Sequence, residues 1–203
     1  MPPRSAPPRA WQRMLSGRRL DLLDPSPLDV EISDIAHGLA RVARWNGQTL
    51  GPHAFSVAQH SLLVEQIFVL IGEPPTPAER MVALLHDAAE YVIGDMISPF
   101  KAVVGGGYRE VEHRLRRAIH LRFALPAEPT RKLEARIKRA DQICAYHEAT
   151  TLAGFSPREA TSFFGKPDGM RPDQLLLVPE PTEAVQLAFV SRFGALEAAR
   201  HAG

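Results

Sequence analysis

The stretch Thr76–Asp95, TPAERMVALLHDAAEYVIGD, decides the fold class that we predict for this chain. Its first four residues have the form of a capping box with proline at the first helical position, which is typical of a helix N-terminus. Apolar residues then recur at helical spacing, at Met81, Val82, Leu85, Ala89 and Val92. Gly94 ends the pattern, so we predict one helix over about residues 76–94.

The same periodicity predicts helices along most of the chain. We expect them at about residues 56–71, 108–124 and 130–153, with others that begin at Ser33, Ser156 and Thr182. No confident alternating strand is found, so the fold class is all-α. The proline-rich residues 1–17 read as a disordered or extended arm, and residues 18–203 as one globular domain whose motifs lie within 33–153.

Composition limits the classes of function that we expect. The 203-residue chain has a formal net charge of +1, which gives no overall attraction to nucleic acid or to a membrane surface. Its single cysteine, Cys144, allows no intramolecular disulfide, and no stretch has the ~18 apolar residues of a membrane span. The N-terminus lacks the apolar segment of a signal peptide. We therefore expect a cytoplasmic protein without a nucleic-acid or membrane partner.

Three predicted helices carry ionisable side chains on the apolar stripe that should be buried. These side chains are His60, His86, Asp87 and Asp141. A carboxylate on a buried stripe is costly unless it is paired or binds a cation, and one shared cation would satisfy all four groups. Two imidazoles with two carboxylates suit a transition-metal ion better than Ca²⁺. We therefore predict a site for one divalent metal ion, which is Co, Mn, Fe, Ni, Zn or Mg.

Ordinary structural roles are the alternative for each of these residues taken alone. A single histidine on an apolar stripe is more often a hydrogen-bonded core residue than a ligand. Asp141 has Arg136 and Lys138 close by as possible ion-pair partners. His113 and His120 stand on an arginine-rich helix, and we interpret both as surface residues. The combination of three separate segments, rather than any one residue, favours the metal site.

A further carboxylate shares the helix face of the expected ligands. Glu90 lies four residues after His86 and three after Asp87, so it is expected beside the metal without being needed to hold it. Such a group can act as a general base or acid, whereas its alternative role is a solvent-exposed ion pair. Asp95 follows the predicted helix end, and we expect it either at the same site or in an ordinary turn.

Taken together, these motifs resemble the HD superfamily of metal-dependent phosphohydrolases, whose pattern is a histidine, a His-Asp pair and a later aspartate. The similarity covers about residues 33–150. It is closest to the branch of the 5′-deoxynucleotidases and the deoxynucleoside triphosphate hydrolases, and it is carried by Arg44-Trp45, Leu84–Asp95, Ser98–Lys101 and Lys138–Tyr146. Tyr91 stands where the (p)ppGpp hydrolases usually have an acidic residue. The resemblance implies a single HD-type helical bundle.

The resemblance also implies a role for each matched residue. The four inward-facing residues would hold the metal, and Glu90 would handle the proton of the attacking water or of the leaving group. Arg44 would hold the phosphate, Trp45 would pack on the base or sugar, and Asp95 would contact the sugar or order water. Lys101 would add positive charge near the phosphates.

The implied substrate is a nucleotide. Release of phosphate from deoxynucleoside monophosphates is the leading expectation. A triphosphohydrolase, or a metal-stabilised regulatory module without turnover, is the alternative. Because proteins of this branch are commonly dimers, we also expect a homodimer.

Overall fold

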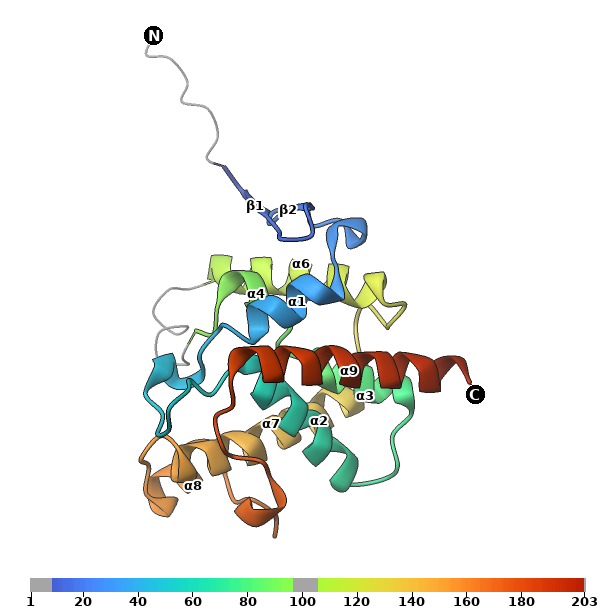
Figure 1. The fold of residues 1–203 in the computed structure, drawn as a ribbon. Helices are drawn as coiled ribbons and strands as arrows, with labels where there is room; N and C mark the ends of the chain where they lie inside the picture. Colours follow the sequence, from blue (N-terminus) through green and yellow to red (C-terminus); the bar gives the residue numbers. More distant parts are fainter. Residues whose placement is uncertain (1–8, 97–105, 203) are drawn as a thin grey trace.

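The computed structural model describes residues 9–96 and 106–202, and helices make up most of it (Figure 1). The predicted all-α class is therefore confirmed. The described strands are Trp11–Arg13 (β1) and Arg19–Asp21 (β2), which pair antiparallel in a short hairpin at one end of the molecule. The first of these strands falls within the stretch 1–17 that we expected to be disordered or extended.

The helices follow one another through short connections. In chain order they are η1 (Pro27–Asp29), α1 (Ile32–Leu39), η2 (Arg44–Gly47), α2 (Val57–Leu70), α3 (Pro77–Leu84), α4 (Glu90–Ile93), α6 (Gly106–Arg122), α7 (Arg131–Thr151), α8 (Pro157–Phe164), η3 (Pro172–Gln174) and α9 (Thr182–His201). The capping boxes at Thr76 and Ser156 are present, and Ser56 caps α2 as predicted. Ser33 and Thr182 are not caps, because each already lies in the first turn of its helix.

The helix predicted over residues 76–94 is divided in two. Between Leu84 and Glu90 the backbone closes with bonds from residue i to residue i−3, such as Ala88 N to Leu85 O and Glu90 N to Asp87 O, both 3.0 Å long. This tighter, 3₁₀-type winding turns neighbouring side chains through a larger angle than an α-helix does. The prediction of one helix was therefore wrong at the His-Asp pair itself.

The core is arranged around α2, which packs against α3 and α7. The long C-terminal helix α9 runs across α1, α2 and α3 and covers one face of the domain (Figure 1). A close approach joins α1 to α4, since a Cβ atom added at Gly38 would lie 2.8 Å from both the Cβ and the carbonyl oxygen of Tyr91. Glycine at this position lets the segment that carries Glu90 lie directly on α1.

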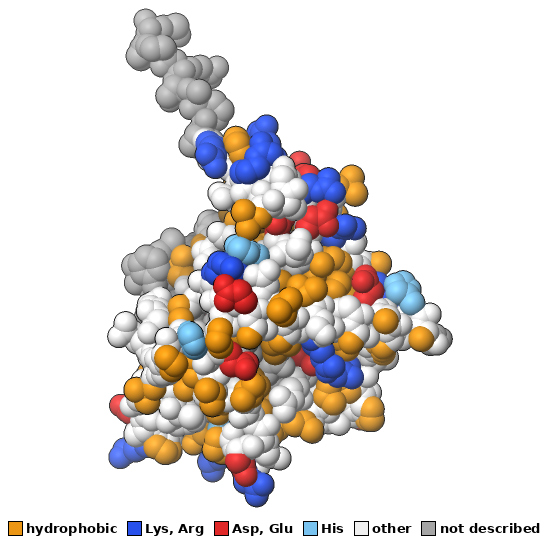
Figure 2. Space-filling view, viewed as in Figure 1, with side chains coloured by type: hydrophobic (Ala, Val, Ile, Leu, Met, Phe, Trp, Pro, Cys, Tyr) orange, Lys and Arg blue, Asp and Glu red, His pale blue; other side chains and the backbone are white. Residues whose placement is uncertain are grey.

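The face that α9 crosses is of mixed character, with hydrophobic side chains between scattered charged groups (Figure 2). On α9 itself, Leu187 and Val190 are exposed, whereas Phe189 and Phe193 are buried. Within the described residues, no helix has both the length and the apolar character needed to cross a membrane.

Candidate metal centre

Side chains from three distant segments converge at one point in the interior. They are His60 on α2, His86 and Asp87 in the turn between α3 and α4, and Asp141 on α7, and we call them the His-Asp cluster. Nε2 of His60 lies 3.3 Å from an Asp141 oxygen and 3.6 Å from an Asp87 oxygen. The same Asp87 oxygen lies 3.1 Å from Nε2 of His86. The four residues that the sequence analysis grouped are therefore neighbours in space.

Both imidazoles point a nitrogen without a hydrogen bond into the cluster. Nε2 of His60 and Nε2 of His86 are buried, and neither makes a regular hydrogen bond among the described residues, although carboxylate oxygens lie 3.3 Å and 3.1 Å away. A buried nitrogen of this kind is costly unless something binds it. Two imidazole nitrogens and two carboxylates around one point could hold a metal ion.

The other nitrogen of each ring fixes its tautomer. Nδ1 of His60 lies 2.5 Å from a Glu148 oxygen, and Nδ1 of His86 lies 3.0 Å from the carbonyl oxygen of Ala83. Because a carbonyl or carboxylate oxygen only accepts, the proton of each neutral ring belongs on Nδ1. The lone pair is then on Nε2, which is the arrangement that a metal-binding histidine needs.

The cluster carries an excess of negative charge. Burial opposes ionisation, yet the neighbouring imidazoles hold the pKa values of Asp87 and Asp141 below their usual range. Burial likewise opposes ionisation of Glu148, but His60 and Arg44 lower its pKa to about 2. Burial and Arg44 act to lower the pKa of His60, and the Glu148 carboxylate overcomes them and raises it well above its ordinary value. Ionised carboxylates around buried rings favour a bound cation.

Two groups of described side chains bring their ligand atoms close enough to hold a metal ion. One is His60 with His86 and Asp141, and the other is His60 with Cys144 and Glu148. In the second group the ligand atoms already bond one another, since Nδ1 of His60 and the Cys144 thiol both lie within hydrogen-bond distance of the same Glu148 oxygen. The first group, which Asp87 adjoins, is therefore the better site.

Asp141 also forms one of the two ion pairs that we considered as its alternative role. Lys138 donates to one Asp141 oxygen at 2.7 Å, while the other oxygen faces His60. The Lys138 side chain is 67% exposed, so this pair is weak and easily released. Arg136 instead donates to the carbonyl oxygens of Phe68 and Glu73 and does not contact Asp141.

Arg44 and Trp45 reach the same region from η2. Trp45 Nε1 donates to a Glu148 oxygen at 2.8 Å, and Arg44 lies 3.4 Å from that oxygen and 3.0 Å from Asp95. The Trp45 backbone has a φ of 57°, a left-handed conformation that is rare for a bulky residue. Its ring packs against Phe155 and Phe164, which hold it in place. Two of the expected substrate-site residues, Arg44 and Asp95, therefore form an ion pair.

Glu90 is buried in the first turn of α4, three residues after Asp87. Tyr108 on α6 donates to the carbonyl oxygen of Gly94 at 3.3 Å. Burial raises the pKa of Tyr108, and the nearby carboxylates that raise it further include Glu90, Asp95 and Asp87. These carboxylates therefore share the surroundings of one phenol. Lys101 lies outside the described residues.

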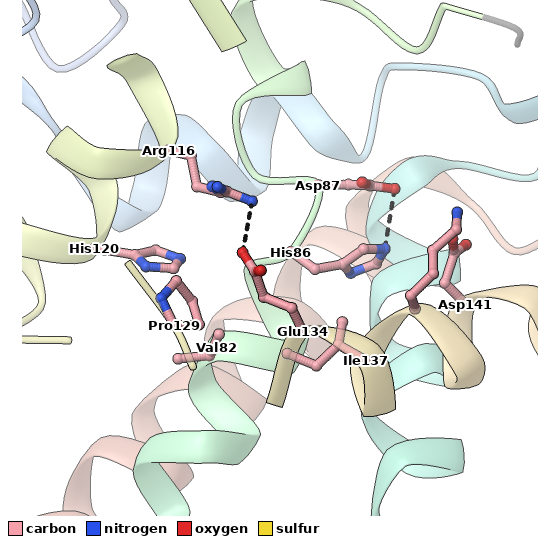
Figure 3. Close-up of a pocket in the computed structure, with 10 residues that line it drawn as sticks. Val82, His86, Asp87, Arg116, His120, Pro129, Glu134, Ile137 and Asp141 are labelled. Carbon is pink, nitrogen blue, oxygen red and sulfur yellow. Dashed lines mark hydrogen bonds and ion pairs between the residues drawn. The ribbon is translucent and has the colours of Figure 1, made fainter. Parts of the chain in front are cut away.

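A pocket of about 260 Å³ opens beside the cluster, and residues of α6 and α7 line it together with His86, Asp87 and Asp141 (Figure 3). His120 is among the lining residues and only 1% exposed, so its interpretation as a surface residue was wrong. His113 does lie at the surface, with 47% of its side chain exposed.

Glu148 is the residue of this site that sequence reasoning missed. It lies seven residues after Asp141 on α7, which is two helical turns and therefore the same helix face. That spacing was the available signal. A buried glutamate on the stripe of Asp141 is as unusual as Asp141 itself.

The comparison with known proteins identifies a relative, but the name of that relative gives no activity. The chain is 56% identical over 184 residues to the uncharacterized protein RCAP_rcc00048 of Rhodobacter capsulatus, and the match covers 91% of this chain and 94% of that protein. No protein-family model matches the chain.

Proposed function

The chain belongs to one family with RCAP_rcc00048 of Rhodobacter capsulatus, and we propose that it is an HD-type metal-dependent phosphohydrolase that releases phosphate from deoxynucleoside monophosphates. The observation that carries this proposal is the convergence of the two unbonded Nε2 atoms on the carboxylates of Asp87 and Asp141. A purely structural helical bundle has no need to bury two such nitrogens beside ionised carboxylates.

The His-Asp cluster would hold the metal ion, with Glu148 and Ala83 O orienting the two imidazoles. When bound, the ion supplies a water of lowered pKa and polarises the phosphate. Glu90, which is buried and lies three residues after Asp87, would take the proton of the attacking water. The water oxygen bonds to phosphorus, the bond from phosphorus to the sugar oxygen breaks, and that oxygen takes up the proton that Glu90 would hold.

Arg44 supports phosphate as the group that is bound. Its guanidinium is paired with Glu148 and Asp95, so its position is fixed before a ligand arrives. A planar guanidinium with donors left over meets phosphate oxygens well. Asp95 would then act as a positioning residue for Arg44.

A substrate screen tests the proposal. Deoxynucleoside mono-, di- and triphosphates are supplied with Mn²⁺, Co²⁺, Mg²⁺ or Zn²⁺, and the products are separated by chromatography. We expect inorganic phosphate from the monophosphates. Release of inorganic tripolyphosphate from triphosphates would instead identify the protein as a triphosphohydrolase. Bound metal without any turnover would reduce the protein to a binding module.

Variants of one carboxylate sharpen the test. Glu90→Gln keeps the shape of the side chain, so we expect retained metal and a loss of at least ~100-fold in turnover. Glu110→Gln, at an exposed position on α6, is the matched control. Full activity in Glu90→Gln would remove its role in proton transfer.

A further inference from the structure

His120 presents a hydrogen-bond acceptor to the pocket beside the cluster. Its Nδ1 lies 2.7 Å from the carbonyl oxygen of Pro126, so Nδ1 carries the proton and Nε2 carries the lone pair. Nε2 is buried and has no hydrogen-bond partner among the described residues. The side chain is 1% exposed and lines the pocket. A ligand with an N–H or O–H donor would satisfy this atom.

Arg116 presents donors to the same pocket. It lies one helical turn before His120 on α6, and its Nε is buried without a hydrogen-bond partner among the described residues. Its ion pairs with Glu128 and Glu134 are both 3.7 Å long, which is beyond hydrogen-bond distance. The guanidinium is therefore held loosely by two carboxylates, and its N–H groups can bond a ligand acceptor.

The remaining walls of the pocket suit a ring more than a second phosphate. Val82, Pro129 and Ile137 give it an apolar side, and Glu134 adds a carboxylate between α6 and the cluster (Figure 3). A phosphate dianion would meet this carboxylate and the lone pair of His120, although Lys138 also lines the pocket. A volume of about 260 Å³ is near the lower end for small-molecule pockets.

The position of the pocket fixes which part of a ligand reaches it. Figure 3 shows Arg116 and His120 at one side of the pocket and residues of the His-Asp cluster at the other. A molecule whose phosphate lies at the cluster extends its other end toward α6. In a nucleotide that end is the nucleobase, which carries an acceptor and an N–H donor on neighbouring atoms.

We propose that this pocket binds the nucleobase of the substrate, with Arg116 donating to a base acceptor and His120 Nε2 accepting from a base N–H. The proposal rests on the proposed function for the placement of the phosphate. Base recognition itself needs no hydrolysis, so the two can fail separately.

Binding of phosphate-free ligands tests the pocket directly. The four deoxynucleosides, with 2-deoxyribose as the base-free control, are titrated into the metal-loaded protein by calorimetry. We expect at least one deoxynucleoside to bind more tightly than 2-deoxyribose. His120→Asn keeps a donor for Pro126 O but lacks Nε2, so the Kd of that nucleoside should rise about three- to tenfold. His120→Gln, which can place an oxygen near the Nε2 position, should recover part of the loss.

His53→Asn is the matched control, because His53 is exposed and does not line the pocket. If His120→Asn fails to fold, Arg116→Gln decides, since 32% of that side chain is exposed and a comparable loss is expected. Unchanged Kd values in the folded variants, or deoxynucleosides that bind no better than 2-deoxyribose, would overturn the inference. Nucleoside binding that depends on His120 in a protein without phosphatase activity would keep it and reject the proposed function.

Discussion

Glu148 Oε1 lies 2.5 Å from His60 Nδ1, and both side chains are completely buried. The carboxylate takes the hydrogen bond of the imidazole and leaves Nε2 directed at Asp141. A carboxylate behind a metal-binding histidine fixes the ring orientation and makes the opposite nitrogen a stronger donor. Glu148 is therefore the orienting group of the proposed metal site.

Replacing Glu148 should weaken metal binding without removing a ligand. Glu148→Gln keeps the size of the side chain but loses its charge, so we expect metal affinity to fall about 10- to 100-fold. Competition with a chelator of known affinity measures the change. Glu183→Gln, at an exposed position in the first turn of α9, should bind metal as the parent does. Equal affinities in Glu148→Gln and Glu183→Gln would contradict the orienting role.

Trp45→Phe should lower stability through one lost hydrogen bond. Phenylalanine keeps an aromatic ring against Phe155 and Phe164 but cannot donate to Glu148. We expect the free energy of unfolding to fall by about 1–2 kcal/mol, as for a partly buried hydrogen bond to a charged acceptor. Urea unfolding followed by circular dichroism in a chelator measures it. Trp11→Phe, in the hairpin, is the control, and a loss as large there would argue against a specific effect.

Gly38→Ala should destabilise the protein although alanine favours helices. The new Cβ would lie 2.8 Å from two atoms of Tyr91, one of them a backbone oxygen. Crowding of this kind costs about 1–3 kcal/mol, which matches or exceeds the ~1 kcal/mol that alanine gains over glycine within a helix. Thermal unfolding provides the comparison. Gly194→Ala on α9 meets nothing within 4 Å and should raise the melting temperature, so a similar rise in Gly38→Ala would refute the close contact.

Acid should weaken the metal-free protein partly through His120. Burial lowers the pKa of His120 below its ordinary value of 6.5, so its contribution is present above pH 6.5 and lost as the pH falls through the folded pKa. His147, also shifted down by burial, acts in the same direction. The raised pKa of His60 has the opposite sign, with its contribution already complete below about pH 6.5.

The measurement is the free energy of unfolding between about pH 6.5 and pH 5, above the range in which carboxylates titrate. His120→Asn should lose less stability over this window than the parent chain. Identical slopes for His120→Asn and the parent would show that His120 does not titrate as a buried base.

Local signals predicted most of the fold. Caps such as Ser56 and Thr76 act through the backbone of their own first turn, so the residues that decide them are adjacent in sequence. The apolar stripe of the helix that carries His60 could be predicted, because buried residues repeat with the helical period. The grouping of His60, His86, Asp87 and Asp141 followed from polar residues placed where apolar ones are expected, and the structure brings them together.

The features that we could not predict from the sequence depend on contacts between distant segments. The sequence between Leu84 and Glu90 contains no glycine or proline that would indicate a 3₁₀-type turn. We therefore attribute the tighter winding there to tertiary packing. His120 looked like a surface residue among arginines, and only the approach of the Pro126 carbonyl and the α7 side chains buries it. Helical periodicity identifies the apolar face of a single helix. It cannot identify residues on other faces that a loop or a neighbouring helix buries.

Because His60 and Arg44 share Glu148, the proposed metal site and the proposed phosphate site should be coupled. One of its oxygens serves His60, and the other serves Trp45 and Arg44. An anion bound by Arg44 takes up part of its positive charge and leaves more of the Glu148 charge for the imidazole, so such an anion and the cation should each bind more tightly in the presence of the other. Thermodynamic reciprocity requires the two gains in affinity to be the same factor.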